Sequence, residues 1–112
     1  MEHVEREARV PAPPDAVWPA LVVPERLGVW LGGEVDLEVR PGAFGSFRSA
    51  NGEVRRVVVL VVDDGRELTF RWWPETDAGA ASTVEITVRE ADDGESTVRV
   101  RETRAQALLA TA

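Results

Sequence analysis

The chain has 112 residues and a formal net charge of −7, and it contains no cysteine and a single histidine. This length predicts one domain, residues 1–112, with its own hydrophobic core. The missing cysteines exclude disulfides, thiolate metal sites and thiol nucleophiles, and we expect neither a metal nor a cofactor. Because phosphate binding needs a basic surface, the acidic balance argues against nucleic acid as a partner.

Nothing in the chain predicts export or membrane insertion. The N-terminus is charged and alternating, unlike a signal peptide. The longest wholly apolar run, Val57–Val62, is far too short to span a bilayer. We therefore expect a cytoplasmic protein without a membrane partner. Every cationic side chain is arginine, which together with many Ala, Val and Gly suggests a GC-rich bacterial source.

The first third of the chain predicts one strand and two short helices. Residues 3–10 alternate, with Val4, Arg6, Ala8 and Val10 on the face toward the core. Residues 15–21 predict a helix that is short or kinked, because Pro19 lacks the backbone N–H that the helix needs. Residues 24–31 predict a second helix, which starts at a proline and ends at Gly32-Gly33.

The rest of the chain predicts an antiparallel meander of hairpins. X-Gly turn signals recur at regular spacing, and Pro41-Gly42 suits a type II turn. The expected strands are 35–39, 44–49, 54–62, 67–73, 83–90 and 97–102. With the first strand, the sheet has about seven. A longer loop, 74–81, is the segment that we expect to move.

The later strands alternate apolar and charged residues, so one sheet face must be covered. The apolar face carries Leu68, Phe70, Trp72, Val84, Ile86, Val88, Val98 and Val100. Residues 103–112 predict an amphipathic helix with Ala105, Leu108, Leu109 and Ala112 on one side. Such a helix spans only about 14 Å, too little to roof a sheet of seven strands.

Four pieces, in this order, resemble the START-like (SRPBCC, birch-pollen-allergen-like) superfamily, nearest its heat-shock-protein-90 ATPase activator-like branch. They are PAPPDAVWPAL, PERLGVWLG, RELTFRWW and STVEITV. The resemblance implies an α+β helix-grip fold, in which a curved antiparallel sheet closes around a long C-terminal helix with a cavity between. In this chain that helix is largely missing, so we expect a truncated sequence or a partner subunit that supplies the cover.

We interpret the proline- and tryptophan-rich stretch from Pro11 to Gly33 first as a structural segment that fixes the fold, and we call it the clasp. Val17, Trp18 and Leu21 form one apolar side, and Leu27 and Trp30 form another. Direct ligand contact stays open for both tryptophans, more so for Trp30.

The candidate ligand site lies on the apolar face of the sheet. Arg48, on the Phe44 side of its strand, is the proposed polar anchor for an acidic or carbonyl group; an ordinary surface arginine is the alternative. The apolar residues could equally be plain core. The candidate ligand-binding residues are Trp30, Arg48, Phe70, Trp72, Val84, Ile86, Val98 and Val100.

No catalytic constellation is apparent in the sequence. His3 lies near the end of the chain on the charged side of its strand, as expected of an exposed bystander. The Asp63-Asp64 and Asp92-Asp93 pairs lack the spacing of a calcium loop and predict hairpin turns.

These observations favour a non-enzymatic carrier or sensor of a small apolar molecule. Two alternatives stay open. One is a protein-interaction module related to chaperone ATPase activators, with a homodimer covering the exposed sheet face. The other is an enzyme like the polyketide cyclases and aromatases of the superfamily, which need mainly a shaped cavity.

Overall fold

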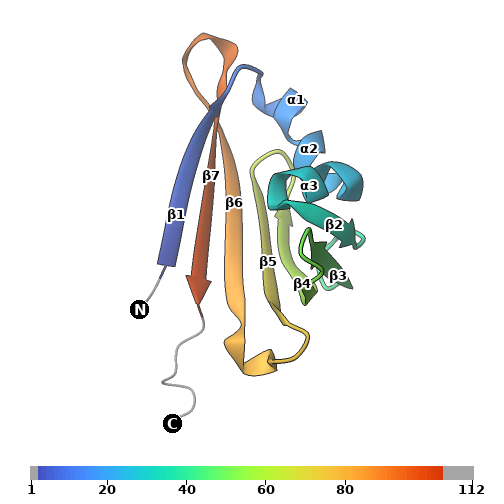
Figure 1. Cartoon of the computed structure of the whole chain (residues 1–112). Coiled ribbons are helices and arrows are strands. Elements are labelled where there is room, and N and C mark those ends of the chain that lie inside the picture. The colour runs from blue at the N-terminus through green and yellow to red at the C-terminus, as the bar shows by residue number, and fades with distance from the viewer. Residues whose placement is uncertain (1–2, 105–112) are drawn as a thin grey trace.

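The computed structural model describes residues 3–104, which form one curled antiparallel sheet with short helices against it (Figure 1). The seven strands lie in the order β1-β7-β6-β5-β4-β3-β2. This confirms the predicted α+β fold with a seven-stranded meander. The strands are β1 (His3–Val10), β2 (Gly33–Asp36), β3 (Phe44–Ser49), β4 (Val54–Asp63), β5 (Glu67–Pro74), β6 (Ser82–Glu90) and β7 (Ser96–Arg104).

Two of the predicted turns show why glycine stands where it does. The Ala43 N–H donates to the Arg40 carbonyl at 3.1 Å, and Gly42 between them has φ 84°, which confirms the type II turn. Asp93 and Gly94 both have positive φ, 61° and 72°, as a type I′ turn requires. The short 3₁₀ segments, η1 (Ala78–Ala80) and η2 (Asp92–Gly94), lie in the β5–β6 and β6–β7 connections.

Two strands, β2 and β7, differ from their expected bounds by two residues or more at one end or both, and the other strands by at most one residue. β2 starts at Gly33 and ends at Asp36, because Leu37 leaves the ladder and buries its side chain in the core. β7 continues to Arg104, since Thr103 still pairs with His3 on one side and Thr83 on the other. The predicted C-terminal helix otherwise lies outside the described residues.

The first predicted helix is two helices of one turn each, α1 (Pro14–Val17) and α2 (Pro19–Val22). The break falls at Trp18, as the missing N–H of Pro19 predicts. The second helix, α3 (Pro24–Leu31), has the expected bounds and ends at Gly32 in the left-handed conformation, φ 84°.

The clasp interpretation of residues 11–33 is confirmed for most of its apolar side chains. Val17, Trp18, Leu21 and Leu27 are buried in the same core as β4–β7. A hydrogen bond also ties the stretch to the sheet: the fully buried Ser96 hydroxyl of β7 donates to the Ala12 carbonyl at 2.6 Å. The helices therefore close one end of the curled sheet.

β1 keeps the predicted alternation but not the predicted burial. By register Val4, Arg6, Ala8 and Val10 share the inner face with Val98 and Val100 of β7. Of these four only Val10 is half-buried, and Val4 is 56% exposed. The reason is geometric, because α1–α3 lie toward the other edge of the sheet, where β2–β4 are, and leave most of β1 uncovered (Figure 1).

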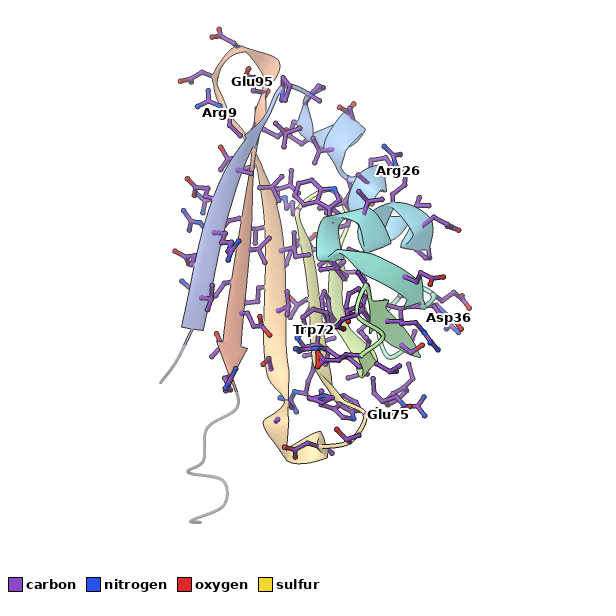
Figure 2. The ribbon with its side chains drawn as sticks, in the orientation of Figure 1. Arg9, Arg26, Asp36, Trp72, Glu75 and Glu95 are labelled. Carbon is purple, nitrogen blue, oxygen red and sulfur yellow. The ribbon has the colours of Figure 1, made fainter. Side chains whose placement is uncertain are left out.

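The outer face of β1 and β7 carries paired charges instead of apolar side chains. Arg101 forms an ion pair with Glu5, and Arg9 forms one with Glu95 near the β6–β7 turn (Figure 2). Glu7 accepts hydrogen bonds from Arg99 at 2.9 and 3.1 Å, which raises the pKa of this guanidinium above its ordinary value. Exposed pairs like these stabilise little individually. They do explain why this face stays in solvent.

Candidate ligand-binding face

Trp72 is the centre of the candidate site. It lies on the inner face of β5, in the half of the sheet away from α1–α3 (Figure 2). Because side chains alternate along a strand, Trp72 shares its face with the fully buried Leu68 and Phe70, while Trp73 points to the outer face. Trp72 itself is only half-buried, so part of its indole meets solvent.

Four side chains from four strands hold the Trp72 ring. Its Nε1–H donates to Glu102 of β7 at 2.9 Å. Phe47 of β3 and Phe70 of β5 pack against the ring, with centroids 5.4 and 5.3 Å away, and Phe70 meets it edge-on. The Arg55 guanidinium of β4 lies 4.6 Å from the ring centroid. We call these five residues, Phe47, Arg55, Phe70, Trp72 and Glu102, the Trp72 cluster.

Each contact contributes in a known way. Edge-on and tilted aromatic pairs add about 1 kcal/mol beyond their burial. A cation over an indole adds about 1 kcal/mol or more as water is excluded. Together they fix the orientation of a large, partly open aromatic surface.

The inner face around the cluster carries several arginines although the chain as a whole is acidic. Arg6 lies opposite Val100, and Arg104 lies opposite Ser82, so both share this face with Arg55. Glu102 is the acidic residue among them, and its carboxylate is bonded to the Trp72 indole.

The structure brings the predicted apolar site residues to one face but closes most of them into the core. Phe70, Val84, Ile86 and Val98 are almost fully buried. Only Trp72 and Val100 keep partly open side chains on this face. The interpretation of the predicted set as core therefore describes four of these six residues.

Arg48 and Trp30 do not join the Trp72 cluster. The expected orientation of the Phe44–Ser49 strand was wrong: Phe44 is 75% exposed and Phe47 is the buried ring. Arg48 shares the outward side with Phe44 and is exposed. Trp30 is 38% exposed on α3 and forms no ring contact among residues 3–104.

Three members of the cluster were not predicted from the sequence: Phe47, Arg55 and Glu102. For Arg55, the pattern held a signal, because its place two residues before Val57 puts it on the apolar side of β4. The same parity places Glu102 beyond Val98 and Val100 on β7. Neither residue was included in the predicted site, because charged side chains are rarely found on a buried face.

The described residues offer no metal site. Among residues 3–104, no group of three or more His, Cys, Asp or Glu could hold an ion. In the same part of the chain, no helix has the length and apolar character needed to cross a membrane.

A curled seven-stranded antiparallel sheet with short helices after its first strand is the arrangement of the START-like superfamily. The family model for Activator of Hsp90 ATPase homolog 1-like protein matches residues 11–111. The chain therefore belongs to this family. No curated protein sequence matches it.

Solved structures agree with this assignment. A Mesorhizobium loti protein is 23% identical with a TM-score of 0.80, over 94% of this chain and 78% of its own. DynU16, a protein in the dynemicin biosynthetic locus, is 26% identical with a TM-score of 0.80, over 93% of this chain and 38% of its own length. An HSP90 activator from Plasmodium falciparum is 14% identical with a TM-score of 0.74, over 96% of this chain and 76% of its own.

Proposed function

We propose that the chain binds a small apolar molecule against Trp72 on the inner face of the sheet, without covalent chemistry. The observation that supports this most strongly is the half-buried indole, held by neighbours on four strands yet not covered by them. Small-molecule sites are lined mostly by apolar and aromatic side chains with a few placed polar groups, and the Trp72 cluster has this composition. Because the ring is already oriented, little ordering cost remains for binding.

The test uses phenylnaphthylamine, a neutral dye that fluoresces in apolar surroundings. We expect wild-type protein to bind it, and Trp72→Ala to weaken binding by about tenfold or more through loss of the stacking surface. Trp73→Ala is the matched control. This neighbour is also half-buried, but it faces outward beside Arg56.

Folding is checked on both variants by circular dichroism and thermal unfolding. Should Trp72→Ala unfold, Trp72→Phe keeps a ring and is used in the same titration. Equal dye affinity for the Trp72 and Trp73 variants would place the site elsewhere. Absence of dye binding by wild type would overturn the proposal.

A second candidate function, recognition of a protein partner, is favoured by a different surface. Phe44, Leu60 and Val61 are 75%, 43% and 41% exposed on the β3–β4 side of the sheet. The fold is also that of a Plasmodium falciparum HSP90 activator. If this surface pairs copies of the chain, sedimentation velocity gives a dimer that Phe44→Ser converts to monomer. A monomer at every concentration removes the homodimer from consideration.

A further inference from the structure

Arg55 differs from every other arginine in the chain. All arginines lie within residues 3–104, and Arg55 is the one that is half-buried while the others are exposed. In that described range its guanidinium forms no ion pair with a carboxylate, and the group that it contacts is the Trp72 ring. A cation that is partly withdrawn from water and not neutralised is costly, and such a charge is commonly functional.

The N–H donors of the Arg55 guanidinium form no hydrogen bond within residues 3–104. When the flat face of a guanidinium packs on a ring, its N–H donors stay in the guanidinium plane and can bind another group. This fork matches the paired oxygens of a carboxylate, sulfonate or phosphate. A ligand that packs beside Trp72 would therefore present an acidic group to Arg55 at the edge of its ring system.

The neighbouring acid does not cancel this charge. The Glu102 carboxylate accepts the Trp72 Nε1–H at 2.9 Å and forms no ion pair with Arg55 within residues 3–104. Glu102 thus fixes one edge of the indole, while Arg55 lies over one of its two faces. Arg6 lies on the same inner face as Arg55, so around the Trp72 cluster positive charge is concentrated although the whole chain carries −7.

We propose that the Trp72 cluster selects a small planar aromatic anion, with the ring against Trp72 and the acidic group on Arg55. This inference rests on the proposed function, since it concerns the same face, and adds the charge and shape of the ligand. The acidic chain as a whole repels anions. A preference for an anion over its neutral counterpart must therefore come from a local positive group.

The experiment compares two dyes of one scaffold, phenylnaphthylamine and anilinonaphthalene sulfonate, which differ by the anionic group. We expect wild type to bind the sulfonate dye more tightly than the neutral dye, and Arg55→Gln to weaken binding of the sulfonate by about tenfold more than it weakens binding of the neutral dye. Arg71→Gln is the control, because Arg71 precedes Trp72 in the chain but is exposed on the outer face of β5. It should leave both affinities unchanged.

The outcomes separate the two proposals. If neither dye binds wild type, the proposed function fails and the anion preference with it. If the neutral dye binds but the sulfonate is no tighter, or if Arg55→Gln weakens both dyes equally, the anion preference alone is overturned. If Arg71→Gln weakens binding of the sulfonate dye as much as Arg55→Gln does, the anion preference is also overturned.

A competition on wild-type protein does not depend on how well the variants fold. Naphthoate and its methyl ester have the same ring system, and only the first carries a charge. We expect naphthoate to displace the bound sulfonate dye at concentrations about tenfold lower than the ester. Equal potency of acid and ester would contradict the role given to Arg55.

Discussion

Leu21→Ala should destabilise the protein by about 3 kcal/mol, since buried leucine-to-alanine changes cost about 2–5 kcal/mol. Leu21 lies on α2, is 0% exposed and belongs to the core shared by the helices and the sheet. The substitution removes buried apolar area and leaves a cavity that rigid neighbouring strands cannot fill. Because small domains have only about 5–15 kcal/mol of stability, the loss is easily seen in urea unfolding.

The matched control for Leu21 is Val29→Ala on α3, whose side chain is 81% exposed. We expect its unfolding midpoint to stay within error of wild type, because almost no buried surface is lost. Comparable destabilisation by the two variants would contradict the role of α1–α3 as a clasp packed through one apolar side.

Gly33→Ala should cost about 3 kcal/mol or more, above the common range for overpacking, because the new atom meets backbone. A Cβ at Gly33 would collide with the Arg48 carbonyl oxygen and lie 2.8 Å from Cε1 of Phe47. The carbonyl belongs to β3, which pairs with β2 at this point, so neither can yield without breaking the ladder. Urea unfolding with an unchanged m-value measures the effect.

The variant Gly32→Ala distinguishes the cost of backbone strain from the cost of steric crowding that Gly33→Ala measures. Gly32 has φ +84°, and nothing lies within 4 Å of the position that a Cβ would take, so alanine there costs only about 1–2 kcal/mol for the left-handed conformation. We expect Gly33→Ala to be clearly the more damaging of the two. The reverse order would mean that β2 and β3 are not packed as closely as described.

Much of the fold could be predicted because its signals are local. The turns at Pro41-Gly42 and Asp93-Gly94 have the backbone conformations that their residues favour. Pro19 splits the first helix for a reason visible in the sequence. The alternation of β5, β6 and β7 correctly identifies their buried face.

The site was harder to predict because it depends on contacts between distant strands. β3 carries phenylalanines on both faces, so alternation alone could not decide whether Phe44 or Phe47 points inward. Only the packing of Phe47 against Trp72 settles that choice, and it sends Arg48 outward. Arg55 reaches the Trp72 ring because β4 pairs with β5, with Arg55 opposite Pro74, two residues beyond Trp72 on the same face.

Binding of a small apolar molecule against Trp72, as we propose, can be tested at the indole ring itself. The most direct measurement is an NMR titration of the tryptophan indole N–H signals, one for each of the chain's four tryptophans, with phenylnaphthylamine. We predict that the Trp72 signal shifts most, because ligand stacks on its ring beside the bond to Glu102. The Trp73 signal, on the opposite face, should stay in place. A largest shift at Trp73 or Trp30, or no shift at any of the four, would contradict the account.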